Sequence, residues 1–132
     1  MAEARSFWGR HHVQSFRDLR GELRRFFEQR DIPAGVCDDL ILAAQEACNN
    51  ACRYGTDGMG CDLAVSFADG TVTIEVADRG PGFDLGAVKA MWPPALLEAG
   101  GRGLFLIAEL TDQIEVVERG PGTLVRIFKA IG

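Results

Sequence analysis

The sequence predicts an α+β fold, a two-layer α/β sandwich in which helices cover one face of a mixed β-sheet. Three observations predict it. Apolar residues recur at helical spacing in the first half of the chain, and two pairs of segments with alternating apolar residues follow. A long connection and a short helix separate the two pairs. The order of helices, hairpin, connection, helix and hairpin is typical of a sandwich with segregated helices and strands.

The size and charge of the chain limit its possible functions. Its 132 residues, 47% hydrophobic and 25% charged, predict a single domain over residues 1–132 with a hydrophobic core. The net charge of -5 argues against direct binding to nucleic acid, whose partners usually display a basic surface. The sequence contains no apolar run of about 20 residues, which a membrane span needs, and its first residues do not resemble a signal peptide. These observations predict a cytoplasmic protein that does not enter a membrane.

The N-terminal part predicts one strand and one helix. Ser6 to Val13 contain apolar residues that alternate weakly, which predicts an edge strand. From Ser15 to Gln29, large apolar side chains recur at helical spacing and predict an amphipathic helix. Its polar face is basic and carries Arg17, Arg20, Arg24 and Arg25, with Arg30 just beyond. Such a face is usually solvated, although it could also dock an acidic partner.

A long central helix is predicted to follow the sequence Asp31-Ile32-Pro33 and to end near Gly55. The aspartate is suited to a capping position and the proline to a first helical turn, so they predict a stop and a restart. Opposite the apolar stripe of this helix lies a polar group, Glu46, Asn50 and Arg53, whose members fall within about 60° of one another on a helical projection. A Glu/Asn pair at this spacing is also common on a solvated face, so the helix alone leaves that alternative open.

Two hairpins and one connection complete the chain. After the glycine-rich break at residues 56–60, alternating residues from Cys61 to Phe67 and from Thr71 to Asp78 flank the turn pair Asp69-Gly70, which predicts an antiparallel hairpin. Residues 83–101 are apolar but broken by glycine and proline, which predicts a lid with short helical pieces. The remaining predicted elements are a helix over Leu104–Thr111 and a hairpin of Ile114–Glu118 with Thr123–Ile131.

Cysteines do not suggest a metal site. The four cysteines, Cys37, Cys48, Cys52 and Cys61, have neither CxxC spacing nor a matching histidine pair, so a zinc site is not expected. Small, weakly polar thiols beside an alanine-rich stripe pack well in a core. We therefore predict that these cysteines are reduced core residues.

Asp78 is a candidate binding residue. It shares strand parity with Val72, Ile74 and Val76, which predicts that its carboxylate points to the buried face where the strand ends. A buried acceptor requires a donor, and the exocyclic amine of adenine would satisfy it. The following glycines, Gly80 and Gly82, would let the backbone approach a flat base closely. The alternative is an Asx turn in which Asp78 bonds its own backbone.

A second glycine cluster is a candidate phosphate site. Gly101, Arg102 and Gly103 immediately precede a predicted helix, whose first backbone N–H groups and positive dipole end attract anions. A plain helix stop is the alternative for this cluster. Thr123 has the parity of Val125, so its hydroxyl is predicted to face inward, although a threonine there could simply favour a strand.

Taken in chain order, the candidate residues form four motifs: Glu46-x-x-x-Asn50, Asp78-x-Gly80-x-Gly82, Gly101-x-Gly103 and Gly122-Thr123. Together they resemble the N box, G1 box, G2 box and closing Gly-Thr pair of the GHKL (histidine-kinase-like) ATPase/kinase superfamily. The resemblance covers the chain from about Phe16 onward. The small size and the segment GGRGLFLI resemble its anti-sigma-factor serine/threonine kinase branch.

The resemblance implies a sandwich of the Bergerat type and a role for each matched residue. Glu46 would be the catalytic general base, and Asn50 would ligate Mg²⁺ through its amide oxygen. Asp78 would accept the adenine amine with support from Thr123. The implied nucleotide-binding set is Asn50, Arg53, Asp78, Gly80, Gly82, Gly101, Arg102, Gly103 and Thr123. Tyr54 stands where related proteins often have histidine, and either ring could pack beside the nucleotide.

The implied function is that of an ATP-dependent protein-serine kinase and anti-sigma regulator. Such a protein sequesters a sigma factor and phosphorylates an anti-anti-sigma partner of the STAS type, and the branch also implies a homodimer. The 132 residues leave no length for the phosphoacceptor hairpin of a sensor kinase, so a partner protein is the expected acceptor. A non-catalytic ATP-binding switch and a slow ATP hydrolase are the alternatives. The presence of Glu46 favours the kinase over the switch, because a purely structural ATP site needs no base.

Overall fold

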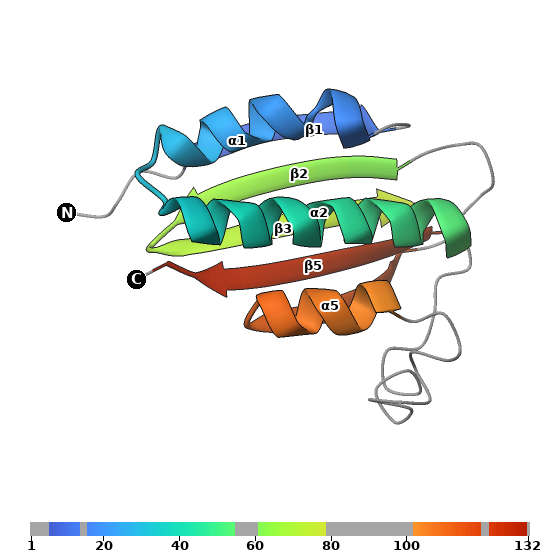
Figure 1. The fold of residues 1–132 in the computed structure, drawn as a ribbon. Coiled ribbons are helices and arrows are strands. Elements are labelled where there is room, and N and C mark those ends of the chain that lie inside the picture. Colours follow the sequence, from blue (N-terminus) through green and yellow to red (C-terminus); the bar gives the residue numbers. More distant parts are fainter. Residues whose placement is uncertain (1–5, 14–15, 55–60, 79–101, 120–121, 132) are drawn as a thin grey trace.

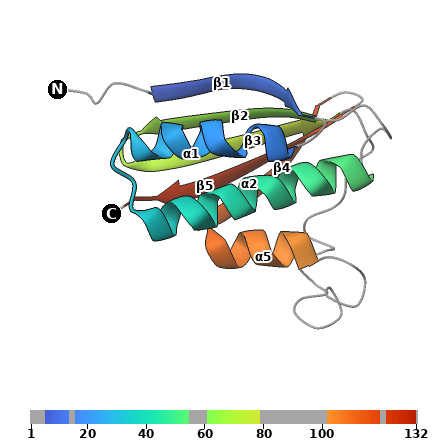
Figure 2. The ribbon, with the colours of Figure 1, turned by 45° about the horizontal axis from the view of Figure 1, so that its top comes forward.

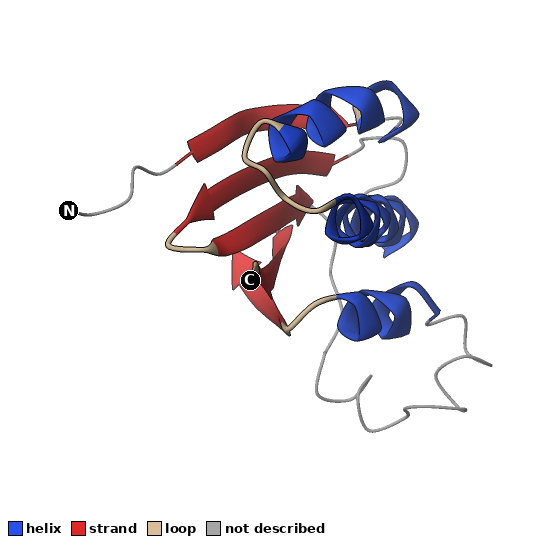
Figure 3. Cartoon of the chain, turned by 60° about the vertical axis from the view of Figure 1, so that its left-hand side comes forward, coloured by secondary structure: helices blue, strands red, loops and turns tan. Residues whose placement is uncertain are grey.

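The computed structural model describes residues 6–13, 16–54, 61–78, 102–119 and 122–131. These residues form two layers, a five-stranded sheet and a layer of helices that covers one of its faces (Figure 1, Figure 3). This arrangement confirms the predicted α+β sandwich. The candidate lid at residues 83–101 and the glycine-rich break at residues 56–60 lie outside the described residues.

The sheet has the strand order β1-β2-β3-β5-β4. Its strands are β1 (Ser6–Val13), β2 (Cys61–Ala68), β3 (Thr71–Asp78), β4 (Gln113–Arg119) and β5 (Gly122–Ala130). The sequence predicts a mixed sheet, whereas each of the four ladders in the described part is antiparallel. The reason is that β5 folds back from β4 as a hairpin and enters beside β3, which it meets in the opposite direction.

An ionic row on the open face of the sheet runs across β3, β5 and β4. Arg126 is the register partner of both Glu75 and Glu115. Its Nε donates to Glu75 Oε2 at 3.2 Å, and its Nη1 donates to Glu115 Oε2 at 3.3 Å. These half-exposed pairs support the position of β5 between its two neighbours, because opposite charges directly across a ladder stabilise the pairing.

The first predicted helix is divided in the structure. A 3-10 turn, η1 (Phe16–Asp18), precedes helix α1 (Arg20–Glu28), and Leu19 stands between them. The prediction of one helix from Ser15 to Gln29 is therefore wrong at its start. The buried apolar residues Leu23, Phe26 and Phe27 confirm its predicted amphipathic character.

A Schellman motif ends α1. The Ile32 N–H donates to the Phe27 carbonyl and the Asp31 N–H to the Glu28 carbonyl, while Asp31 takes a φ of 57°. Ile32 and Phe27 are both buried, as this motif usually requires of its flanking residues. Asp31 thus belongs to the end of α1. The prediction that it caps the next helix is wrong, because its backbone closes the preceding one.

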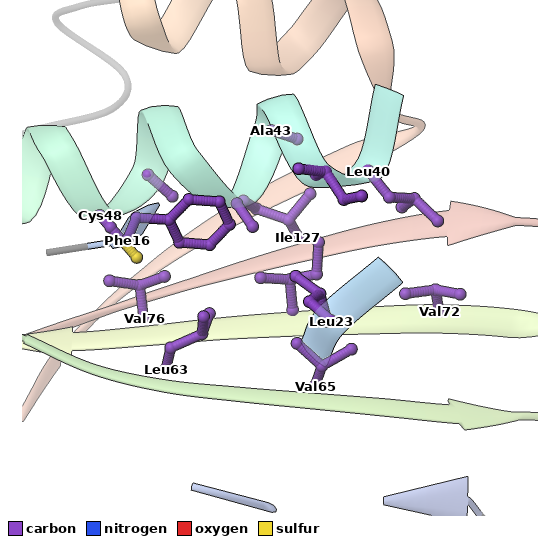
Figure 4. Packing of buried hydrophobic residues seen from close by; sticks show 14 of the residues in the cluster. Phe16, Leu23, Leu40, Ala43, Cys48, Leu63, Val65, Val72, Val76 and Ile127 are labelled. Atoms are coloured by element: carbon purple, nitrogen blue, oxygen red, sulfur yellow. The ribbon is translucent and has the colours of Figure 1, made fainter. Parts of the chain in front are cut away.

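Helix α2 (Ala34–Tyr54) runs through the centre of the helical layer and confirms the predicted central helix. It contacts α1 on one side, α5 on the other and the strands β2 and β3 beneath. Two polar contacts join α1 to α2. Arg24 forms a salt bridge with Asp38 at 2.7 Å, and Arg20 donates a hydrogen bond to Gln45 at 2.6 Å. Between α2 and the sheet lies the core, shown in Figure 4, whose labelled members are Phe16, Leu23, Leu40, Ala43, Cys48, Leu63, Val65, Val72, Val76 and Ile127.

The β2–β3 hairpin confirms its predicted turn. Asp69 and Gly70 both have positive φ, 53° and 72°, as a type I′ turn requires. A two-residue turn of this type fixes the register, and the inward residues Val72, Ile74 and Val76 are fully buried. The strand parity predicted for this hairpin is therefore correct.

Helix α5 (Arg102–Leu110) begins two residues earlier and ends one residue earlier than predicted. Arg102 and Gly103 therefore belong to its first turn and do not lie in a loop before it. Thr111 leaves the helix with its hydroxyl donating to the Ile107 carbonyl at 2.6 Å, which satisfies one of the last carbonyl groups. None of the helices in the described part is both long enough and apolar enough to span a membrane.

Candidate functional site

The predicted site residues that the structure describes lie at one end of the molecule. Helix α2 and strand β3 both end there, and strand β5 and helix α5 both begin there (Figure 1, Figure 2). Antiparallel pairing of β3 with β5 produces this meeting of ends, and the packing of α5 against α2 adds the helical side. Four segments that are distant in the sequence thereby present their polar ends to one region.

Asn50 is the described residue that most clearly lacks a partner. It lies on α2, is only 7% exposed, and its Nδ2 is buried with no hydrogen-bond partner among the described residues. A buried donor without an acceptor costs about 1–3 kcal/mol, so such atoms in a folded protein need an explanation. A polar ligand at this end of α2 would supply the missing acceptor.

Glu46 lies one helical turn before Asn50 on α2 and is half-buried. Its carboxylate is therefore on the same side of the helix as the Asn50 amide, as the helical projection predicts, and remains accessible to solvent. Arg53 belongs to the last turn of α2, but its side chain lies outside the described part of the chain.

Asp78 and Thr123 are placed together by the sheet. They are register partners in the β3–β5 ladder, and the next inward pair is Val76 with Val125, both buried. Alternation along the strands thus supports an inward orientation of Asp78, which is half-buried. The side chain of Thr123 lies outside the described residues.

Cys61 is a neighbour of Asp78, although its sequence pattern predicts only a core residue. Asp62 pairs with Ala77, so the next position along both strands places Cys61 beside Asp78. A hydrogen bond from the Cys48 thiol lowers the pKa of Cys61, against burial and the negative charges of Asp62 and Asp78, which raise it. The turn pair Asp69-Gly70 could have predicted this neighbour. A two-residue turn fixes the register of the hairpin, and in that register Cys61 lies opposite Asp78.

The three described cysteines agree with the prediction of reduced core residues. Cys37, Cys48 and Cys61 are buried and in the thiol form. Burial raises the pKa of Cys37, whose Sγ donates to the Ile32 carbonyl at 3.4 Å. The side chain of Cys52 is outside the described part.

The phosphate side of the predicted site is described only at the start of α5. Arg102 and Gly103 lie in the first turn of this helix, where backbone N–H groups have no partner within the helix. Such a turn can still receive an anion, so the earlier start of α5 leaves the predicted use of Gly103 intact. Gly80, Gly82 and Gly101 lie outside the described residues, as does the side chain of Arg102.

The described side chains fit a magnesium ion that is held mainly by the phosphates of a bound ligand and by few protein atoms. Within the described residues, no group of three or more His, Cys, Asp or Glu side chains is arranged to hold a metal. Mg²⁺ in phosphate sites typically takes one or two protein oxygen ligands and completes its shell with phosphate and water. The Asn50 Oδ1 is a hard oxygen ligand of the kind that Mg²⁺ takes, and the Nδ2 beside it, which has no partner among the described residues, can donate to a phosphate oxygen.

Comparison with known families gives a match over residues 11–129 to the family described as Histidine kinase-like ATPase domain. Among curated proteins, the chain is 36% identical over 104 residues to the serine-protein kinase RsbW of Bacillus pumilus, covering 70% of this chain and 64% of that protein. It is 30% identical over 106 residues to the serine-protein kinase RsbW of Staphylococcus epidermidis, covering 71% of this chain and 65% of that protein. The chain thus spans slightly less than two thirds of the length of these relatives.

Solved structures share the fold at low sequence identity. The RsbU and RsbW domains of a Mycobacterium tuberculosis protein superpose with a TM-score of 0.63 at 21% identity, over 93% of this chain and 32% of that chain. The SiaB–SiaC complex of Pseudomonas aeruginosa gives a TM-score of 0.61 at 13% identity, over 95% of this chain and 91% of that chain. The histidine kinase AdeS of Acinetobacter baumannii gives 0.54 at 15% identity, over 94% and 68%.

Proposed function

Because the chain belongs to the family of histidine kinase-like ATPase domains, we propose that it is an ATP-dependent protein-serine kinase that also acts as an anti-sigma regulator. The observation that carries the proposal is the buried Asn50 Nδ2, which has no partner among the described residues, one turn from the half-buried Glu46. Relatives named serine-protein kinase support the choice of acceptor.

The nucleotide would lie across the end of the sandwich where α2, β3, β5 and α5 meet. Asp78 would accept the adenine amine beside its register partner Thr123, and Gly80 and Gly82 would allow the base to approach the backbone. The first turn of α5 would face the phosphates. The residues assigned to phosphate binding are Arg53, Gly101, Arg102 and Gly103.

Asn50 would hold the magnesium ion through its Oδ1 and leave its Nδ2 to donate to a phosphate oxygen. This assignment satisfies the amide at both ends, which the described protein atoms do not. Magnesium bound at this position neutralises part of the phosphate charge.

Glu46 would be the general base. Its position one turn from Asn50 would bring a carboxylate near the end of the phosphate chain, and its partial exposure would let an acceptor hydroxyl reach it. The carboxylate would take the proton from the incoming serine as the serine oxygen bonds to the γ-phosphorus, while the bond from that phosphorus to the bridging oxygen breaks and ADP leaves. A site that used ATP only to set a conformation would not need this group, so Glu46 favours a kinase over a non-catalytic switch.

The proposed acceptor is a STAS-domain partner, and the proposed target of sequestration is a sigma factor. The names of the curated relatives support a serine acceptor. A structural neighbour was solved as the SiaB–SiaC complex, which supports a role that depends on a partner. We further propose that the protein is one domain over residues 1–132, forms a homodimer and acts in the cytoplasm, where ATP is supplied.

A phosphotransfer assay tests the proposal. The protein would be incubated with γ-labelled ATP, Mg²⁺ and a STAS protein recovered with it from its native cell, and labelled serine on the partner is the expected product. Release of labelled phosphate without a labelled partner would favour the slow hydrolase. ATP binding with neither product would favour the non-catalytic switch.

A further inference from the structure

The sheet has an open face that none of the described helices covers, because these helices all lie on the other face (Figure 3). Along β3 the buried residues Val72, Ile74 and Val76 point to the helices, so the residues between them point to the open face. Among the described residues, three large hydrophobic side chains are exposed. Two of them, Phe7 at 57% and Val117 at 37%, belong to the open face by strand register. Exposed apolar side chains that share one face favour contact with another molecule.

The outward side chains of the β3–β5 ladder form three register pairs, and each pair joins unlike members. In every pair β3 supplies the smaller or acidic side chain, and β5 supplies the larger or basic one. The two strands therefore present rows on the open face that are complementary to each other in size and in charge. The pairs are Thr73–Phe128, Glu75–Arg126 and Ala77–Leu124.

A second copy of the chain can use this complementarity. A two-fold axis parallel to the strands and midway between β3 and β5 sets β3 of each copy against β5 of the other. Phe128 of one copy then lies over Thr73 of the second copy, and Arg126 lies over Glu75 of the second copy. The fit is closest beside the axis, because packed sheets are rotated by about 30° relative to each other and diverge towards their edges.

We propose that two copies of this chain pair through the open face of the sheet, with the two-fold axis between β3 and β5. The proposal assigns a surface to the homodimer proposed above, and it does not depend on the ATP site. A nucleic acid or an anionic membrane would need a basic surface, whereas Glu75, Arg126 and Glu115 alternate in sign across this face. A second copy presents the same alternation and supplies the opposite charge beside the axis.

The ionic row can enter such an interface because its charges are already paired within the chain. Arg126 donates to Glu75 at 3.2 Å and to Glu115 at 3.3 Å. Covering a charge is costly mainly when it is left without a partner, so these three charges can be covered together. The second copy then adds an opposite charge to each member of the Glu75–Arg126 pair.

The proposed arrangement leaves the helical layer and both ends of each sandwich free. The proposed nucleotide site lies at the end where α2 and β3 finish (Figure 1). An axis parallel to the strands places this end of both copies on the same side of the dimer. If the ATP site proposed above is correct, both nucleotides would therefore enter from one side.

The first test measures the mass of the full chain in solution without nucleotide, by sedimentation equilibrium. We expect a dimer. Thr73→Arg places a long cation where Phe128 of the second copy would pack, so the dissociation constant of the dimer should rise by about 100-fold. Phe7→Ala, which removes an exposed apolar side chain from the β1 edge of the same face, is the matched control and should leave the dimer unchanged. Circular dichroism checks that both variants fold.

A second measurement does not need a disruptive variant. Thr73→Cys and Phe128→Cys proteins are mixed, allowed to exchange and treated with a short bismaleimide, because packed sheets stand about 10 Å apart. A link between positions 73 and 128 can form only between copies, since no chain carries both changes. Mass spectrometry of the digest should show this link in the mixture and in neither variant alone. A mixture of Phe7→Cys with Phe128→Cys should show no link between positions 7 and 128.

A chain that stays monomeric overturns the proposal, and so does a dimer that the folded Thr73→Arg variant leaves intact. A link between positions 7 and 128 without one between 73 and 128 would place the axis between β2 and β3 and overturn the assigned interface. If Thr73→Arg does not fold, the cross-link between 73 and 128 decides alone. Failure of the phosphotransfer assay would reject the kinase and leave this result standing, because neither measurement here uses ATP.

Discussion

Asp78, the last residue of β3, and Thr123, near the start of β5, are direct register partners in an antiparallel ladder. The two residues are 45 positions apart in the sequence, yet the sheet holds them side by side. They lie at the end of the molecule where α2 ends and α5 begins (Figure 1). We propose that both residues contact the adenine base, so a substitution at Asp78 tests this part of the nucleotide site.

The change Asp78→Asn should weaken binding of adenine nucleotides. The mutant keeps the shape of the side chain but replaces a charged acceptor with a neutral one, so the expected loss is about 1 to 3 kcal/mol. Calorimetry with ATP measures it, and Asp69→Asn in the β2–β3 turn is the matched control, since asparagine also tolerates the positive φ found there. Equal ATP affinity in the Asp78 mutant and the parent would mean that Asp78 only shapes the turn.

The change Asn50→Ala should remove magnesium-dependent binding of ATP with little loss of stability in the absence of nucleotide. The mutation deletes a buried donor that has no described protein partner, so relief of its desolvation cost offsets part of the lost packing. Thermal unfolding with and without Mg-ATP checks this, and the exposed neighbour Asn49→Ala is the control. A nucleotide-dependent rise in melting temperature that survives in Asn50→Ala would contradict the assignment.

The change Gly103→Ala should reduce affinity for ATP more than affinity for adenosine. Gly103 lies in the first turn of α5, where alanine suits the helix better than glycine by about 0.8–1 kcal/mol, so the damage should come from a methyl group placed where phosphate approaches the backbone. Competition binding with the two ligands measures the difference. Gly21→Ala in α1, whose added Cβ meets no atom within 4 Å, should change neither affinity. Parallel losses for both ligands would indicate a folding defect.

The change Glu46→Gln should separate catalysis from binding. Glutamine keeps the size of the side chain but cannot accept the serine proton, so phosphoryl transfer should fall by about 10² to 10⁴-fold while ATP affinity changes little. Single-turnover transfer to the STAS partner is the measurement, with Glu28→Gln on the exposed side of α1 as the control. If Glu46→Gln transfers as fast as the parent, Asp39 on the same helix becomes the next candidate base.

The change Asp31→Gly should stabilise the protein by up to about 1 kcal/mol, because glycine adopts the left-handed conformation of the Schellman motif without the Cβ penalty. Urea unfolding measures the change. The mutation lies far from the proposed nucleotide contacts, so ATP affinity should not move. A loss of stability would indicate that the Asp31 side chain contributes more than its backbone angle.

Most of this fold could be predicted from turn residues and apolar spacing, because these patterns depend on neighbouring residues in the sequence. The pair Asp69-Gly70 predicted both the turn and the register that buries Val72 and Val76, since a two-residue turn leaves no freedom in strand pairing. The same register would have set Cys61 beside Asp78. The helical spacing of Glu46 and Asn50 likewise placed them on one side of α2.

Other features depend on contacts that the sequence does not display. Leu19 interrupts the first helical segment although its apolar spacing continues. Its N–H closes a 3-10 turn on the carbonyl of the buried Phe16. The start of α5 at Arg102 was hidden by flanking glycines that disfavour a helix in isolation, and packing against α2 overrides that preference. The antiparallel pairing of the described strands follows from where β5 inserts, which local patterns do not specify. That the Asn50 Nδ2 is buried without a partner among the described residues depends on how α2 packs, which local patterns also do not specify.

The position of β5 also has a consequence for synthesis of the protein. This strand is the last described element in the sequence, yet it lies between β3 and β4 and carries Thr123 to Asp78. A ribosome-bound chain that has emerged only as far as β4 still lacks the strand that joins β4 to the sheet and one side of the proposed base contact. During translation, ATP would therefore stabilise molecules that have added β5 over those that stop short of it.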